Sequence, residues 1–274
     1  MTDVVSFGEI LWDVIDGVPH LGGAPFNFAV HCAKCGLSAA IISAVGNDDL
    51  GRRACDKARQ YGVDIHGVSV LEDRPTGTVL VKLSDDGMPS YDIRTDAAWD
   101  EISVTKNQLE GACPRAVYFG TLAQRSLVSA ATLRRVLEAW PEAEAFFDVN
   151  LRQTYWSKPL VEEGLARATV LKLNDEEQVR LGIVPSAMFA AYKNLKIVIV
   201  TKGAEGCEVF LKDGSSFVSP AVPAGPVVDT VGAGDAFSAA FLTALLNGAK
   251  PQEAAWAGNV RGGYVASKVG AIPD

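Results

Sequence analysis

The chain has 274 residues, of which 48% are hydrophobic and 21% are charged, and its formal net charge at pH 7 is −8. This length and composition predict a folded protein with one large α/β domain, alone or with a small appendage. The acidic balance argues against nucleic acids and anionic membranes as partners, and no apolar run approaches the ~20 residues of a membrane-spanning helix. The first residues lack the charged and apolar regions of a secretory signal peptide.

The first quarter of the chain alternates short apolar runs, typical of buried strands, with helical patterns. We predict strands at residues 4–8, 39–45 and 67–71, a helix from Pro25 to about residue 35, and another that follows residues 46–51 and ends near residue 61. Gly36 lies just past the first of these helices, as helix-ending glycines do. Asn27 lies in the first turn beside Gly22-Gly23. It could serve the helix start, or hold a ligand hydroxyl through its donor and acceptor.

Residues 76–83 and 90–94 alternate apolar and polar residues around Asp85-Asp86-Gly87, a pattern typical of a β-hairpin. No crossover helix follows, so this segment departs from the strand–helix alternation. It could be an ordinary extension of the sheet. We favour a flap over a site, because the chain then returns to Trp99 and a regular α/β pattern.

From about residue 105 the strand–helix alternation is regular. We predict strands at residues 116–119, 145–149, 170–173 and 197–201, a hairpin at 206–211 and 216–218, and helices at 106–110, 127–140, 160–168, 175–181, 186–194, 235–247 and 252–265. Such alternation implies a mostly parallel sheet that is covered by helices on both faces.

Polar residues follow the carboxyl ends of five predicted strands, which is where sheets of this kind bind ligands. These residues are Glu9 and Asp13; Gln124 and Arg125; Asp148, Asn150 and Arg152; Asn174 and Glu177; and Thr201, Lys202 and Gly203. Each alone could be a helix cap or a surface group. Their recurrence at one edge predicts a polar cleft suited to a sugar, a metal and phosphates.

Residues 229–237 lead from a proline-rich loop into a helix with the sequence Asp-Thr-Val-Gly-Ala-Gly-Asp-Ala-Phe. The unpaired N–H groups and the dipole of a helix start attract anions. Gly232 and Gly234 would let a phosphate approach the backbone closely. Asp235 is unexpected there, because an anion site does not need a carboxylate. It could merely favour the helix start.

Several other kinds of site are absent from the sequence. There is no P-loop motif, no third glycine of a dinucleotide-binding fingerprint and no Gly-x-Ser-x-Gly elbow. Cys32 and Cys35 form a CxxC pair that could be a redox motif. No second pair completes a zinc site. We favour ordinary helix packing over a redox role, because both cysteines lie late in a helical pattern that Gly36 follows. The five cysteines fit a reducing, cytoplasmic compartment best.

With these motifs in view, the chain resembles sugar kinases of the ribokinase, or phosphofructokinase-B, family over nearly its whole length, and fructokinase-like members in particular. The segments that carry this resemblance are residues 229–237, 22–30 and 46–51 and the Asn174-x-x-Glu177 element. The resemblance implies a three-layer α/β/α sandwich with a mostly parallel central sheet. It also implies a single domain over residues 1–274, with a small β lid from about 11–21 and 76–98.

The resemblance implies ATP-dependent transfer of the γ-phosphoryl group to a sugar hydroxyl. Fructose is the first expectation for the sugar, while ribose, a nucleoside, tagatose 6-phosphate and 2-keto-3-deoxygluconate stay open. Magnesium would bridge the ATP phosphates largely through water, as suits an ion that keeps its hydration shell. A homodimer stays open as well. A non-catalytic sugar or nucleotide sensor is the alternative, but a pure binder has no use for Asp235 as a base.

The resemblance also implies a role for each site residue. Asp235 would take the hydroxyl proton, and N–H groups of Gly232, Ala233 and Gly234 would bind the transferring phosphoryl group. The sugar would be bound by Asp13, Gly22, Gly23, Asn27, Arg94 and Arg125. The nucleotide would be bound by Asn150, Arg152, Asn174, Thr201, Gly203, Gly206 and Asn259. Glu177 would hold magnesium indirectly, and a potassium-like cation would lie among Asp229, Val231, Val265, Lys268 and Gly270.

Overall fold

The central feature of the computed structural model, which describes residues 2–83 and 89–274, is a nine-stranded sheet. Its strand order is β13-β12-β11-β10-β9-β8-β1-β4-β5, and pairing is parallel from β11 to β5 and antiparallel at the β12–β13 edge. The strands are β1 Val4–Phe7, β4 Ala39–Gly46, β5 Asp64–Leu71, β8 Ala116–Phe119, β9 Glu144–Asp148, β10 Val170–Asn174, β11 Ile197–Thr201, β12 Cys207–Leu211 and β13 Ser216–Ser219.

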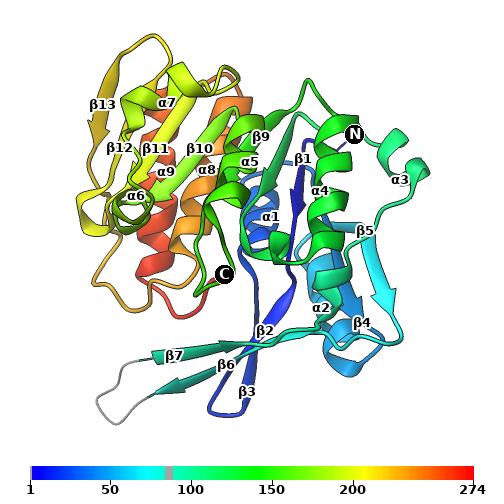
Figure 1. Ribbon diagram of the computed structural model, residues 1–274. Helices are drawn as coiled ribbons and strands as arrows, with labels where there is room; N and C mark the ends of the chain where they lie inside the picture. Colours follow the sequence, from blue (N-terminus) through cyan, green and yellow to red (C-terminus); the bar gives the residue numbers. More distant parts are fainter. Residues whose placement is uncertain (1, 84–88) are drawn as a thin grey trace.

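Helices cover both faces of this sheet (Figure 1). One core cluster packs α1 (Ala24–Lys34), α2 (Asp49–Gln60), α8 (Ala233–Leu246) and α9 (Pro251–Ala266) against the strands. The other packs α3 (Lys106–Glu110), α4 (Leu127–Ala139), α5 (Lys158–Arg167) and α7 (Pro185–Ala191) against the opposite face. Neighbouring residues such as Tyr118 and Phe119 enter different clusters, because successive side chains of a strand point to opposite faces. The predicted three-layer α/β/α sandwich is confirmed.

Some predicted boundaries were wrong by a few residues. The helix predicted at 186–194 is α7 and ends at Ala191, because Tyr192 adopts an extended conformation that leads toward β11. The remaining helical elements are a short helix, α6 (Asp175–Leu181), and three 3₁₀ turns, η1 (Ala98–Glu101), η2 (Leu122–Arg125) and η3 (Gly203–Glu205).

A second sheet of four strands projects from one end of the main sheet (Figure 1). Its order is β3-β2-β6-β7, formed by β2 (Leu11–Ile15), β3 (Val18–Gly22), β6 (Gly77–Leu83) and β7 (Pro89–Ile93). The predicted hairpin is therefore present as β6–β7, but in a separate sheet rather than as an extension of the central one. Its predicted turn, Asp85-Asp86-Gly87, lies outside the described residues. Its action as a lid stays a prediction.

Cys32 and Cys35 belong to the end of α1. Cys32 is fully buried, and burial raises the pKa of its thiol well above the usual value. Burial also raises the pKa of Cys35, the residue that ends the helix. A thiol that resists ionisation is a poor nucleophile, so the structure favours packing over redox chemistry for this pair.

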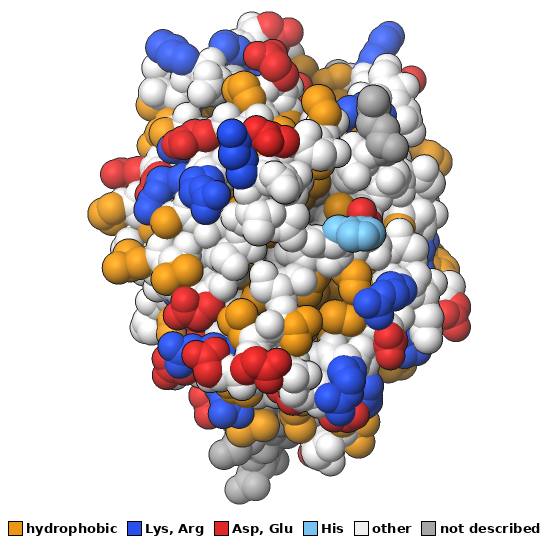
Figure 2. Space-filling model, turned by 90° about the vertical axis from the view of Figure 1, so that its right-hand side faces the viewer, with side chains coloured by type: hydrophobic (Ala, Val, Ile, Leu, Met, Phe, Trp, Pro, Cys, Tyr) orange, Lys and Arg blue, Asp and Glu red, His pale blue; other side chains and the backbone are white. Residues whose placement is uncertain are grey.

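Helix length and surface charge were compared with the prediction that neither membranes nor nucleic acids are partners. No helix in the described part of the chain is long and apolar enough to cross a membrane. On the face shown in Figure 2, acidic and basic side chains are interspersed over the surface.

Candidate active site

The carboxyl ends of the parallel strands lie along one edge of the central sheet. From β1 the sheet runs through β4 and β5 on one side and through β8, β9, β10 and β11 on the other. The chain therefore changes direction between β1 and β8, and a crevice at such a switch point is the usual ligand site of an open α/β sheet. Glu9, Asp148 and Asn174 follow or end β1, β9 and β10, as the sequence predicted.

The start of α8 has no side-chain cap on its first turn. Gly232 is the N-cap residue with φ 75°, and a Cβ there would lie 2.6 Å from the Cβ of Ala271. A Cβ on Gly234 would lie 3.3 Å from the Nζ of Lys172. Glycine is thus needed at 232 for close packing, a Cβ at 234 would be a tight contact, and the uncapped N–H groups of the turn can donate to an anion.

Asp235 stands at this helix start and meets Asn27 of α1. The Asn27 amide donates a 2.9 Å hydrogen bond to Asp235 Oδ2. Burial raises the pKa of Asp235 to about 6, although the Asn27 hydrogen bond and the charges of Lys172 and Arg152 oppose that rise. A carboxylate with a pKa slightly below neutral is ionised at pH 7 and still basic enough to take a proton.

A buried ion pair lies directly beside this turn. Lys172 Nζ is 3.1 Å from Asp148 Oδ1, and the hydroxyls of Tyr118 and Ser238 each donate to Asp148 Oδ2 at 3.2 Å. Burial alone would lower the pKa of Lys172, but the carboxylates of Asp148 and other acids outweigh it and raise that pKa. Lys172 is therefore a fixed positive charge next to Gly234.

The sequence interpretation did not select Lys172. A usable signal was present, because Lys172 is the one charged residue inside the otherwise apolar run 170–173. A lysine is rarely buried in a strand unless a partner charge faces it. Asp148 had been noted at a strand end, but sequence spacing alone did not connect the two residues.

The predicted sugar-binding residues of the N-terminal part come together beside Glu9. A Cβ on Gly22 would lie 2.9 Å from Asp13 Oδ2, and one on Gly23 would lie 2.4 Å from the Glu9 carbonyl oxygen. Burial raises the pKa of Asp13 and raises that of Glu9 to about 7. The charge of Arg152 opposes the rise in pKa of both carboxyls and of Asp235. The Arg152 guanidinium therefore lies on this side of the site.

Asn27 leaves an unsatisfied atom in the site. Its Oδ1 is buried and has no hydrogen-bond partner among the described residues, while its Nδ2 binds Asp235. A buried acceptor without a partner costs free energy unless a ligand or water satisfies it. A ligand hydroxyl would satisfy this atom and would then lie next to the Asp235 carboxylate.

Arg125 is held within the protein. Its Nε and Nη2 donate to Asp100 at 2.8 and 2.9 Å, and Nη2 also donates to the Arg94 carbonyl at 2.7 Å. The guanidinium lies between the rings of Trp99 and Tyr155. Arg125 thus fastens the end of β7, while the Arg94 side chain is exposed. The predicted contacts of Arg94 and Arg125 with a sugar stay predictions.

The Asn174-x-x-Glu177 element joins two strand ends. Asn174 caps α6 by accepting the Glu177 N–H at 2.7 Å, and Glu177 Oε2 accepts the Asn174 N–H at 2.9 Å. Glu177 Oε1 accepts the N–H of Leu151 at 2.7 Å. Leu151 lies between Asn150, which has φ 43°, and Arg152. This box therefore fixes the 150–152 turn, and the indirect contact of Glu177 with magnesium stays a prediction.

The remaining predicted nucleotide residues lie at the β11–β12 side. Thr201 ends β11, Gly203 begins η3, and a Cβ on Gly206 would lie 2.2 Å from the Ser219 carbonyl oxygen. The Asn259 amide donates to the Ser219 and Pro220 carbonyls at 3.0 and 3.1 Å. Gly206 and Asn259 therefore have packing roles of their own.

The predicted cation residues divide into two groups. Asp229 accepts the N–H of Val231 at 3.0 Å and that of Gly270 at 2.9 Å, which joins these three residues. Val265 is buried in α9, and its carbonyl accepts the Lys268 N–H at 2.9 Å. The described residues include no cluster of three His, Cys, Asp or Glu side chains suited to a metal. Phosphate oxygens and water would have to complete the coordination of magnesium.

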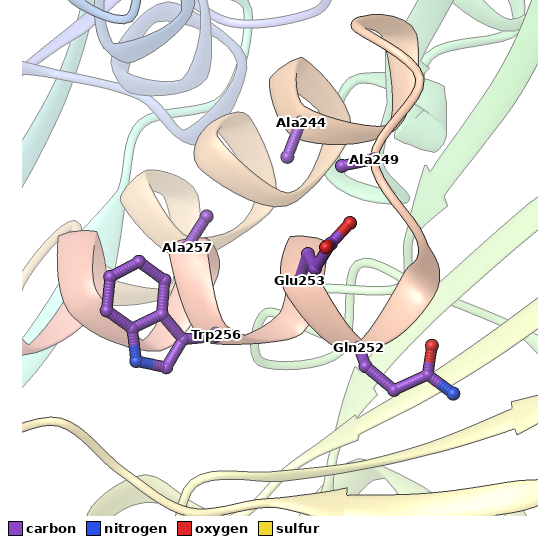
Figure 3. A pocket seen from close by; sticks show the side chains of 6 residues that line it. All are labelled: Ala244, Ala249, Gln252, Glu253, Trp256 and Ala257. Atoms are coloured by element: carbon purple, nitrogen blue, oxygen red, sulfur yellow. The ribbon is translucent and has the colours of Figure 1, made fainter.

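An apolar groove elsewhere on the molecule contains none of the predicted site residues. It lies between α8 and α9 and is lined by Ala244, Ala249, Gln252, Glu253, Trp256 and Ala257 (Figure 3). Glu253 is its single carboxylate, and that group accepts the Lys250 N–H at 2.8 Å as part of the α9 cap. The one carboxylate of the groove is thus engaged in capping α9.

Comparisons with known proteins show which family the chain resembles. The family model described as "pfkB family carbohydrate kinase" matches residues 1–274. Fructokinase-1 of Oryza sativa subsp. japonica is 30% identical over 308 aligned positions, which cover 99% of this chain and 94% of that protein. The uncharacterized sugar kinase PH1459 from Pyrococcus horikoshii in complex with ATP has a TM-score of 0.85 at 27% identity, covering 98% of this chain and 93% of that one.

A third comparison is with fructokinase from Vibrio cholerae O395 in its fructose, ADP and calcium ion bound form. Its TM-score is 0.82 at 25% identity, and the match covers 99% of this chain and 94% of that one. The family match spans the whole chain, and the uncapped helix start with Asp235 lies within it. The chain therefore belongs to the pfkB family of carbohydrate kinases.

Proposed function

We propose that the chain transfers the γ-phosphoryl group of ATP to a hydroxyl of a small sugar, with fructose as its first substrate. The observation that carries this proposal is the position of Asp235. Its carboxylate stands at an uncapped helix start and beside an unsatisfied Asn27 acceptor. This arrangement can hold a hydroxyl, take its proton and bind the phosphoryl group that replaces it.

The reaction divides among groups that the structure brings together. Asp235 accepts the proton of the sugar hydroxyl as that oxygen forms its bond to the γ-phosphorus, and the bond from this phosphorus to the oxygen bridging it to the β-phosphate breaks to leave ADP. N–H groups of the Gly232–Asp235 turn and the Lys172 ammonium stabilise the phosphoryl charge. Phosphoryl transfer depends mainly on such positioning and charge stabilisation.

Metal ions enter the proposal at two points. Magnesium, when bound, would neutralise charge on the ATP phosphates, and Asn174 and Glu177 are the residues proposed to hold it through water. The three residues joined around Asp229 are where a potassium-like ion would lie. A dependence on potassium is left to measurement, because Val269 departs from the residues common in that loop of the family.

The choice of fructose as the substrate is based on the relatives more than on the residues of the site. The rice relative is named a fructokinase, and the Vibrio cholerae enzyme was crystallised with fructose. Ribose, a nucleoside, tagatose 6-phosphate and 2-keto-3-deoxygluconate remain the alternatives. Arg152 does not discriminate among these substrates, because its guanidinium could bind either an anionic substrate or the transferring phosphoryl group. A cytoplasmic location, as the cysteine usage suggested, remains part of the proposal.

A panel of sugars with coupled detection of ADP tests the proposal. Purified protein with ATP and magnesium should form ADP with fructose, and the same panel is run with and without potassium. Turnover with another sugar alone would replace fructose as the substrate. Sugar binding by calorimetry without any turnover would support a non-catalytic sensor instead.

The pH dependence of the rate is a further prediction. Because Asp235 must be ionised to accept a proton, and its pKa in the ligand-free protein is raised to about 6, kcat/KM for the sugar should fall about tenfold per pH unit below pH 6. Above that pH the rate should be level. Glu9, with a pKa raised to about 7, titrates in the same site. In Glu9→Gln the fall below pH 6 should persist, and its disappearance would assign the titration to Glu9.

A further inference from the structure

His31 of α1 is a buried residue that has no part in the chemistry proposed above. Its side chain is fully buried, and its Nε2 lies 2.9 Å from the carbonyl oxygen of Ala271. The guanidinium of Arg261 approaches the other ring nitrogen, Nδ1, at 3.2 Å. Arginine can only donate hydrogen bonds, so Nδ1 accepts and Nε2 carries the proton that is donated to Ala271.

Ala271 in turn lies against the start of α8. A Cβ on Gly232 would come within 2.6 Å of the Ala271 Cβ and 2.7 Å of its Cα, so the two backbones are in direct contact. The adjacent Gly270 N–H donates to Asp229 at 2.9 Å. The segment 270–271 is thus attached to the loop that leads into α8 at two neighbouring points.

The same face of α1 also reaches the proposed base. Asn27 and His31 are four residues apart, so their side chains lie on one face of the helix. Asn27 donates to Asp235, and His31 donates to Ala271. One face of α1 therefore contacts the proposed base, Asp235, directly. The same face contacts Gly232, the N-cap of the proposed phosphoryl-binding turn, through Ala271.

We propose that His31 is a positioning residue that, through the Ala271 carbonyl, holds the Gly232–Asp235 turn in the conformation that binds the transferring phosphoryl group. This inference rests on the proposed function of that turn. Two features distinguish it from simple core packing. The ring nitrogens are both paired in defined directions, and the accepting carbonyl belongs to the residue that lies on Gly232.

Two substitutions separate the hydrogen bond from the volume of the side chain. His31→Leu keeps an apolar side chain of similar bulk but removes the donor. We expect kcat to fall ~10-fold or more, since small displacements of a reacting group cost this much, while the KM values for sugar and ATP change less than ~3-fold. His31→Gln restores a nitrogen donor for Ala271 and should recover most of kcat.

Hydrogen exchange supplies a readout that does not depend on turnover. In His31→Leu, amides in the segment 228–236 should exchange ~10-fold faster or more than in the wild-type protein, while amides of α2 stay unchanged. Val30→Ala is the matched control, because Val30 is equally buried in α1 and makes no contact assigned to this arrangement. It should lower the melting temperature without a selective loss of kcat.

The proposal is overturned if His31→Leu keeps the wild-type kcat and exchange rates. It is also overturned if Val30→Ala loses as much kcat at an equal loss of melting temperature. Absence of turnover by the wild-type protein with every sugar would instead contradict the proposed function. The exchange comparison would still decide whether His31 holds the turn.

Discussion

Asp235→Asn is expected to lower kcat by about 10²–10⁴-fold, the usual contribution of a general base. The substitution keeps the size of the side chain, and the Asn oxygen can still accept the hydrogen bond from Asn27. The KM values for sugar and ATP should therefore change little. The reason for the loss is chemical, because an amide cannot take the proton of the attacking hydroxyl.

The same substitution should leave stability equal or higher. Burial raises the pKa of Asp235 from 3.8 to about 6, so above pH 6 the ionised group disfavours the folded state by up to about 3 kcal/mol. This penalty is absent below pH 3.8 and complete once the pH exceeds 6. Asn carries no charge and avoids it. Residues that reduce stability in this way are common at functional sites.

Urea unfolding at pH 7.5 and steady-state kinetics measure the two effects. Asp49→Asn is the control, because Asp49 also lies in the first turn of a helix but is exposed. It should keep the wild-type kcat. A fall of less than tenfold in Asp235→Asn would show that another group takes the proton.

Lys172→Met is expected to combine a large loss of stability with a loss of activity. Removing one partner of a buried ion pair leaves an uncompensated charge and costs about 3–5 kcal/mol. Among the described residues, Asp148 would keep the hydroxyl donors Tyr118 and Ser238. The turn at Gly234 would lose the positive charge beside it, so kcat should fall at least ~10-fold.

A double substitution separates the two contributions. Asp148→Asn combined with Lys172→Met removes both charges, so most of the unfolding free energy should return. The low kcat should remain, because the positive charge near the phosphoryl site is still missing. Unfolding in urea and the ADP assay are run on the single and double variants together.

Lys196→Met is the matched control for the ion pair. Lys196 Nζ lies 2.6 Å from Glu144, but the Lys196 side chain is 56% exposed. An exposed pair contributes about 0–1 kcal/mol, so this variant should unfold almost as the wild type does. A double variant with full activity would show that the Lys172–Asp148 pair serves only the fold.

Much of the fold was predictable from local patterns. Apolar runs of four to eight residues and helical periodicity located every strand of the central sheet, and glycine and proline marked many of the ends. The residues of the 229–237 motif were predictable for the same reason. The anion-binding helix start proposed there is made of consecutive residues, so the sequence displays it directly.

The contacts between distant parts of the chain were not predictable. Lys172 faces Asp148 because β10 and β9 are parallel in a register that pairs these two positions. His31 and Ala271 are separated by 240 residues. Sequence spacing carries no information on either contact, since both depend on how helices and strands pack.

The amino-acid sequence by itself determined the strand–helix alternation, the polar strand ends and the Gly232–Asp235 turn, because each of these is set by the conformational preferences of neighbouring residues. The tertiary structure decided the surroundings of those residues. It raised the pKa of Asp235 by burial, placed the Lys172 charge beside Gly234, and used Arg125 to fasten the smaller sheet. Burial and charge pairing are properties of packed elements, so they exist only once the chain has folded.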